Sequence, residues 1–138
     1  MMRWNNNMKI KGWIKNGMGW YDEDLYIVSD KDKKSALYEN KLSYMLNKFE
    51  NKFVICRYAV KNVEFEDITE ELITQIYGDY IEDCEDFRIS EVTSGSYNLT
   101  IIGGHNLTQE LKSYHNKYVI IEIKETKRPE LVDEEDDN

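Results

Sequence analysis

KLSYMLNKFENKFVICRY, residues 41–58, aligns without gaps to NLTQELKSYHNKYVIIEI, residues 106–123, at a constant offset of 65 residues. In both stretches, apolar residues at i, i+4 and i+7 predict a helix, an Asn-Lys pair predicts a turn with a left-handed asparagine, and an apolar run predicts a buried strand. The alignment therefore predicts an internal repeat. Alternatively, any short helix, turn and strand would converge on a similar pattern. The identical pairs are Leu42/Leu107, Leu46/Leu111, Asn51/Asn116, Lys52/Lys117, Val54/Val119 and Ile55/Ile120.

Each of these stretches follows a predicted hairpin. Residues 9–14 and 23–29 are candidate strands joined by a glycine-containing segment, and residues 87–93 and 97–103 are candidate strands joined by Ser-Gly-Ser. Each half is therefore predicted as ββαβ.

Three helices are predicted. The first covers roughly residues 33–50, and the second begins after Asn106, an N-cap with Gln109 three residues later. A connecting helix between the halves is predicted at about 67–78, because Asp67 and Glu70 form a capping pattern and Gly78 would end the helix. Its apolar face would consist of Ile68, Leu72 and Ile76.

The predicted fold class is α+β, with tandem ββαβ repeats and a mainly antiparallel sheet. Residues 1–128 would form one domain, with the first repeat at about 9–60, the connecting helix at about 67–78 and the second repeat at about 87–125. An acidic tail, residues 129–138, is expected to be disordered. A chain of 138 residues that is 41% apolar can bury one core of ordinary size.

The sequence predicts a cytoplasmic protein. It has no apolar run of 18 or more residues, and its N-terminus lacks the apolar segment of a signal peptide.

Charge divides the chain into two parts. Residues 1–61 hold 12 basic and 7 acidic side chains, whereas residues 62–138 hold 6 basic and 20 acidic ones. Acids kept at such density either create a useful field or simply keep the protein soluble. On the first interpretation, one exposed acidic ridge on and after the connecting helix binds a basic surface of a partner protein. The ridge residues are Glu70, Glu71, Asp79, Glu82, Asp83, Glu85 and Asp86.

The first 21 residues have the opposite character, with four basic residues, no acids and all three tryptophans. Trp4, Trp13 and Trp20 are therefore an alternative interface, because Trp is a frequent anchor of protein contacts. Two other interpretations are that Trp13 and Trp20 belong to the core of the first hairpin, or that the basic and aromatic residues bind nucleic acid. The net charge of −9 argues against general nucleic-acid binding.

No catalytic motif is present, and the sequence predicts neither enzyme activity, nor a cofactor, nor a metal. His105 and His115 would lie at opposite ends of a helix roughly 15 Å long, so they cannot share an ion. Cys56 and Cys84 lack metal-site spacing. A third possibility is a nuclease-like enzyme, because Glu122-Ile-Lys124 has the Glu-x-Lys spacing of metal-dependent nucleases, but no aspartate precedes it between residues 87 and 121.

The unit LxxxLxx[FY]xNK[FY]VI, preceded by a hairpin, resembles small accessory proteins of bacteriophages and mobile elements in AT-rich bacteria. The resemblance implies a non-enzymatic protein that binds a host protein, including inhibitors of nucleic-acid-handling defence enzymes. The runner-up function is a structural or assembly protein that associates through its tryptophan-bearing end. The sequence leaves the partner's identity and the oligomeric state open, and homo-oligomers fit either function.

Overall fold

The protein folds around one seven-stranded antiparallel sheet with the strand order β2-β1-β7-β3-β4-β5-β6. This computed structural model describes residues 7–16, 24–33, 36–69, 73–88, 91 and 94–127. The strands are β1 (Asn7–Asn16), β2 (Leu25–Val28), β3 (Phe53–Lys61), β4 (Thr74–Arg88), β5 (Ser94–Ile102), β6 (His105–Asn106) and β7 (Tyr118–Glu125). The helices are α1 (Leu42–Met45) and α2 (Leu107–Lys112), with 3-10 turns η1 (Tyr38–Asn40) and η2 (Asn47–Phe49). The fold is therefore α+β with a predominance of sheet.

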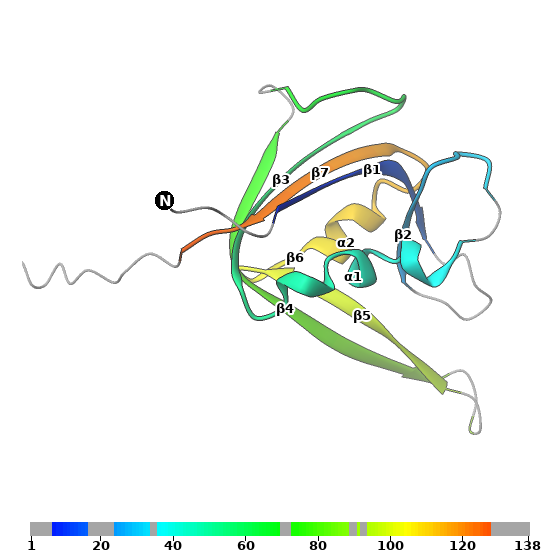
Figure 1. Cartoon of the computed structure of the whole chain (residues 1–138). Coiled ribbons are helices and arrows are strands. Elements are labelled where there is room, and N and C mark those ends of the chain that lie inside the picture. Colours follow the sequence, from blue (N-terminus) through cyan, green and yellow to red (C-terminus); the bar gives the residue numbers. More distant parts are fainter. Residues whose placement is uncertain are drawn as a thin grey trace, which may run out of the picture.

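The sheet curls around the two helices, which lie on its concave side (Figure 1). The long strand β4 bends where it changes partners. It pairs with β3 up to Asp79 and with β5 from Tyr80 onward. Gly78, just before this change, has a φ of 144°. A Cβ atom on Gly78 would lie 2.3 Å from the Cα of Gly103, so the bend requires glycine.

Most of the core lies between the concave face and the helices. Leu42 and Leu46 from the first helical segment and Leu107 and Leu111 from α2 are at most 1% exposed. They pack in one cluster with the inward-facing residues of β7, which include Ile121. This burial accounts for the matching leucines in the two aligned stretches.

A second, smaller apolar cluster covers part of the convex face. Trp13 and Tyr118 are buried there with Ile120, and their rings meet edge to face at 5.2 Å between centroids. Phe65 and Ile68, from the segment that follows β3, pack over this cluster. The segment 62–69 therefore runs across the outside of the sheet.

The two predicted asparagine turns have the same hydrogen bonds. Asn51 and Asn116 have φ values of 67° and 71°, so the predicted left-handed conformation is confirmed. The Asn51 N–H donates to the Tyr80 carbonyl at 2.7 Å, and the Asn116 N–H donates to the Ile14 carbonyl at the same distance. In the reverse direction, Tyr80 donates to the residue after Asn51 and Ile14 donates to the residue after Asn116. Each turn is thereby fastened to a strand from the other half of the chain.

The predicted connecting helix is wrong. Thr74–Arg88 is a strand, Gly78 lies inside it, and Ile68 lies in the segment that covers the convex face. The apolar positions at 68, 72 and 76 are spaced by four, which suits a helix face but also one face of a strand. The β-branched and aromatic residues of Gln75–Tyr80 favour the strand.

The first predicted helix is also wrong in extent, because the described residues of that range, 33 and 36–50, contain only η1, α1 and η2 as helical segments. Lys41 forms a β-bridge with Tyr26 and interrupts the helical path. In the second predicted hairpin, β4 ends at Arg88 rather than at residue 93, and Ser94-Gly-Ser begins β5 instead of forming a turn.

The N-cap of the second predicted helix is confirmed, because the Asn106 side chain accepts the N–H of Gln109 at 3.0 Å. The predicted tail, residues 129–138, lies outside the described residues. None of the helices in the described part of the chain is both long and apolar enough to cross a membrane.

Candidate functional site

A polar row crosses four strands of the convex face. Lys9 on β1 lies opposite Glu122 on β7, Glu122 lies opposite Arg57 on β3, and Arg57 lies opposite Gln75 on β4. Directly opposed residues in an antiparallel sheet project to the same face, so these four side chains form one line.

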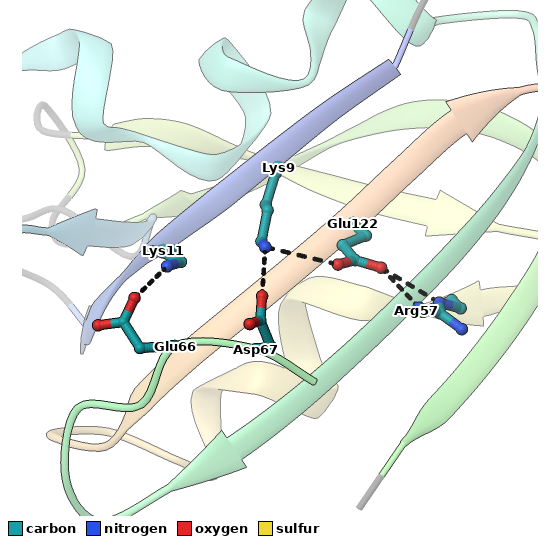
Figure 2. A network of polar contacts seen from close by, with 6 residues as sticks. All are labelled: Lys9, Lys11, Arg57, Glu66, Asp67 and Glu122. Carbon is teal, nitrogen blue, oxygen red and sulfur yellow. Dashed lines mark hydrogen bonds and ion pairs between the residues drawn. The ribbon is translucent and has the colours of Figure 1, made fainter. Parts of the chain in front are cut away.

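Ion pairs tie this row together (Figure 2). The Arg57 guanidinium donates from Nη2 and Nε to Glu122 Oε1, at 2.8 and 3.3 Å. Lys9 Nζ lies 3.9 Å from Glu122 Oε2 and donates to Asp67 Oδ1 at 3.0 Å. The hydrogen bond that Lys9 donates to Asp67 raises the pKa of Lys9, and the same bond lowers the pKa of Asp67. With the Lys11–Glu66 pair at 3.5 Å, these contacts hold the segment 62–69 against the sheet.

A depression of about 540 Å³ opens beside the row. Three cationic side chains line it, from Lys9, Arg57 and Lys124, against the single carboxylate of Glu122. The remaining lining residues are Asn7, Met8, Ile55, Gln75 and Ile123. The depression therefore has an excess of positive charge in a protein whose net charge is −9.

The Glu-x-Lys pair of the nuclease interpretation lies in this depression, because Glu122 and Lys124 both line it. However, one Glu122 oxygen accepts two Arg57 hydrogen bonds, and the surrounding charges are cations that would repel a metal ion. Among the described residues, no group of three or more histidine, cysteine or acidic side chains is placed to bind a metal.

The predicted acidic ridge residues lie mainly on β4. Residues 80–88 of β4 pair with residues 94–102 of β5, and these two segments are called the acidic arm below. The arm extends past the helices as a two-stranded ribbon (Figure 1). Glu82 and Asp83 are consecutive in a strand and project to opposite faces, so a single ridge along a helix is wrong.

The other ridge residues have different positions. Asp79 lies at the bend of β4, opposite Phe53 of β3. Glu85 and Asp86 occupy arm positions opposite Tyr97 and Ser96. Glu70 and Glu71 lie outside the described residues. The structure thus brings four of the seven predicted acids, Glu82, Asp83, Glu85 and Asp86, onto one ribbon.

Glu82 is a partly buried acid of the arm. Burial raises its pKa, and the nearby charge of Glu50 raises the pKa further. Tyr80, two residues earlier, is fully buried, and burial raises the pKa of its phenol.

The tryptophan interface is only partly described. Trp13 is 6% exposed, with the Lys31 ammonium 5.1 Å from its ring centroid. Its burial agrees with the interpretation of Trp13 as a core residue. Trp4 and Trp20 lie outside the described residues.

The histidines lie apart and have different neighbours. His115 Nδ1 accepts the backbone N–H of Asn16 at 3.0 Å, whereas His105 Nδ1 lies 3.5 Å from Glu110 Oε2. The other oxygen of Glu110 accepts the Tyr58 hydroxyl at 2.9 Å. Burial, followed by this hydrogen bond, raises the pKa of Tyr58.

The two cysteines have different environments. Burial raises the pKa of the Cys56 thiol to about 12, so this side chain is a neutral core residue at physiological pH. Cys84 is exposed on the arm.

Sequence reasoning missed Arg57, Gln75 and Lys124 as members of one site. The available signal was the pairing of Arg57 with Glu122, which occupy the same position of the two aligned stretches and carry opposite charges. Comparisons with protein-family models, curated proteins and solved structures found no match to this chain.

Proposed function

We propose that this is a non-enzymatic binding protein whose acidic arm occupies a basic surface of a partner protein. The observation that carries the proposal is the charge of the arm on a fixed backbone. The arm contains four acids, Glu82, Asp83, Glu85 and Asp86, and a single base, Arg88. A nine-residue ladder from Tyr80↔Ile102 to Arg88↔Ser94 holds the ribbon together, so the charges do not depend on a flexible loop.

The arm is also fixed where it leaves the body of the protein. Gly78 and Gly103 approach each other at its base, and the Asp24 carboxylate accepts the backbone N–H of Asn98 at 3.3 Å along its edge. A preorganised charged ribbon loses less conformational entropy on binding than a disordered acidic segment. Like charges at this density attract a basic partner over a distance and accelerate the encounter.

The partner class follows from charge and from the resemblance described above. A surface rich in lysine and arginine is typical of nucleic-acid-handling proteins. We therefore propose a host enzyme of this class as the partner, and inhibition by competition with nucleic acid as the result. An assembly role through the tryptophans is less well supported, because Trp13 is buried.

The test compares two variants of the full chain with equal charge. The arm variant carries Asp83→Asn, Glu85→Gln and Asp86→Asn. The control variant carries Asp32→Asn, Glu39→Gln and Glu64→Gln, which neutralise three exposed acids elsewhere. Proteins captured from a bacterial lysate at low and high salt are identified, and association rates with the purified partner are measured.

We expect a basic partner whose association is slowed by the arm changes and not by the control changes, with a flatter salt dependence for the arm variant. A partner that binds the arm variant as fast as the parent at low salt would show that the acids only keep the arm soluble. Equal slowing by both variants would assign the effect to net charge rather than to the arm.

We further propose that two copies of one ββαβ unit make up the fold. Support comes from the strand order, which places β2-β1-β7 and β5-β4-β3 as mirrored series about the β3–β7 pair. Arg57 and Glu122 are opposite each other in that pair and are also equivalent at the offset of 65, so a pseudo-twofold axis would pass between them. An experimental structure in which residues 41–58 and 106–123 fail to superpose as helix, turn and strand would refute the duplication.

A further inference from the structure

The depression on the convex face has hydrogen-bond donors that the fold does not use. The side chains of Asn7, Gln75 and Lys124 line it, and within the described part of the chain none of them has a hydrogen-bond or ion-pair partner. A lysine ammonium and two amide groups therefore face the same open space. Donors gathered in this way suit an anion with several acceptor oxygens.

Arg57 adds a charged donor whose orientation is fixed. Its Nε and Nη2 are held by Glu122 Oε1, and these bonds leave Nη1 for another acceptor. Glu122 also lies next to Lys9, so its charge is balanced within the row. A guanidinium held by a carboxylate is preorganised to bind the oxygens of a phosphate group.

An aromatic surface lies beside these donors on the same face. Tyr77 is opposite Ile55, Ile55 is opposite Lys124, and Tyr77 is 62% exposed. The Tyr77 and Phe53 rings are 6.5 Å apart between centroids. Because neighbouring strands are about 4.8 Å apart, Tyr77 and Lys124 are separated by about 10 Å at the level of the backbone. The Tyr77 and Lys124 side chains can therefore contact the base and the phosphate, respectively, of one nucleotide.

The charge around the depression favours a small ligand over a polymer. Asp79 lies on β4 two residues beyond Tyr77, and the acidic arm begins immediately after it. An extended polyanion that crossed the convex face would meet these acids, whereas a single phosphate would meet only the cationic end.

We propose that the depression binds a nucleoside 5′-monophosphate, with the phosphate on Arg57 and Lys124 and the base stacked on Tyr77. Stacking on one aromatic ring tolerates any base, so purine and pyrimidine nucleotides would both bind. The interface with the partner protein is assigned to the arm, so this ligand site is independent of the proposed function.

The test is a calorimetric titration of the full chain with AMP, CMP, adenosine, inorganic phosphate and a short single-stranded oligonucleotide. We expect AMP and CMP to bind with similar affinity. Inorganic phosphate and adenosine should bind at least about tenfold more weakly, because inorganic phosphate lacks the base and adenosine lacks the phosphate. Lys124→Gln and Tyr77→Ser should each weaken AMP binding about tenfold.

Lys33→Gln is the matched control, since it removes the same charge from an exposed turn distant in sequence from the depression. Unchanged thermal unfolding of the Lys124 and Tyr77 variants would show that the fold is intact. The proposal is overturned if AMP does not bind, or if the Lys124 and Tyr77 variants bind it as well as the Lys33 variant. Tight binding of the oligonucleotide without binding of AMP would also overturn it, in favour of a nucleic-acid surface.

Discussion

The hairpins β1–β2 and β4–β5 flank the central strand pair and differ in length and charge. β2 has four residues and β5 has nine, so the paired part of the second hairpin is the longer one. β1 carries Lys9, Lys11 and Lys15 without an acid, whereas β4 carries five acids and Arg88. Both hairpins lie in one antiparallel sheet next to the β3–β7 pair, but the charges of their strands differ. The sheet therefore carries basic residues toward one edge and acidic residues toward the other.

The largest expected effect comes from breaking a link between these hairpins. Asp24, just before β2, is 4% exposed, pairs with Lys41 at 2.8 Å and accepts the N–H of Asn98 on β5. Asp24→Ala removes both contacts, so the Lys41 ammonium loses this carboxylate and the Asn98 N–H loses this acceptor. Removing one partner of a buried ion pair costs about 3 kcal/mol of unfolding free energy.

Urea unfolding of Asp24→Ala measures this loss, with Asp32→Ala as a control from the exposed turn after β2. We expect the control to change stability by less than about 0.5 kcal/mol. A loss below about 1 kcal/mol for Asp24→Ala would mean that the contacts of Asp24 with Lys41 and Asn98 contribute little to stability.

The next effect compares the glycines at which the two hairpins make close contacts. Gly78 lies opposite Val54 and Gly12 lies opposite Val119, so they occupy matching places in the sheet. Gly78→Ala combines a positive φ with a Cβ atom 2.3 Å from a backbone carbon, and we expect a loss of about 2–3 kcal/mol. Gly12→Ala would meet the Ile27 side chain and the Val28 carbonyl without a positive φ, so it should cost less.

Gly104→Ala separates the cost of a positive φ from the cost of a close contact of the Cβ atom. Gly104 has a φ of 85°, and a Cβ atom there would meet nothing within 4 Å. Its cost of about 1 kcal/mol measures the backbone conformation alone. Equal costs in thermal unfolding for Gly104→Ala and Gly78→Ala would show that the contact with Gly103 is not needed for the bend.

Gly78 also shows why one part of the fold was predicted from sequence and another was not. Asn51, Asn116 and the Asn106 N-cap act within a few residues, so local patterns predicted them correctly. Gly78 as a helix stop was also a local interpretation, but its role depends on contact with Gly103, 25 residues away. Local patterns cannot distinguish these two roles.

The same difference between local patterns and distant contacts applies to the candidate sites. The acids of the arm were found as a run in the sequence, although their arrangement on two faces required knowledge that β4 is a strand. The convex-face site was missed because it depends on register between β1, β7, β3 and β4. Pairings between strands more than a hundred residues apart, such as Lys9 with Glu122, are fixed by tertiary packing and not by local sequence.

A smaller effect is expected at the centre, where the two halves meet through Arg57 and Glu122. Both side chains are about one-third exposed, so the pair should contribute only about 0.5–1 kcal/mol. Arg57→Gln and Glu122→Gln, measured singly and together by urea unfolding, give the coupling energy. A coupling energy near zero would mean that the ion pair between Arg57 and Glu122 does not stabilise the fold. We expect Glu122→Gln to be the worse of the two single changes, because it leaves Arg57 and Lys9 side by side without the carboxylate between them.

The smallest effect distinguishes the two faces of the acidic arm by pH. The folded-state pKa of Glu82 is raised above its ordinary value of 4.5, because burial and the charge of Glu50 penalise the ionised form. Its stabilising contribution is therefore fully present below pH 4.5 and is lost as the pH rises through the folded-state pKa. Glu82→Gln removes this titration. The melting temperature of the variant should rise relative to that of the parent as the pH increases from 4.5 through the folded-state pKa, and should then stay level.

Asp83→Asn is the matched control, because it removes one charge from the next residue, on the opposite and exposed face of β4. Lower repulsion along the arm should raise the melting temperature slightly in both variants at neutral pH. Only the Glu82 variant should gain an additional increase, since Glu82 is partly buried whereas Asp83 is exposed. If the two variants gave the same curves against pH, the faces of the arm would be equivalent, and the arm would be a solvated ribbon on both sides. A difference confined to Glu82→Gln would instead show that burial at Glu82 makes the two faces of the arm unequal, because Asp83 on the opposite face is exposed.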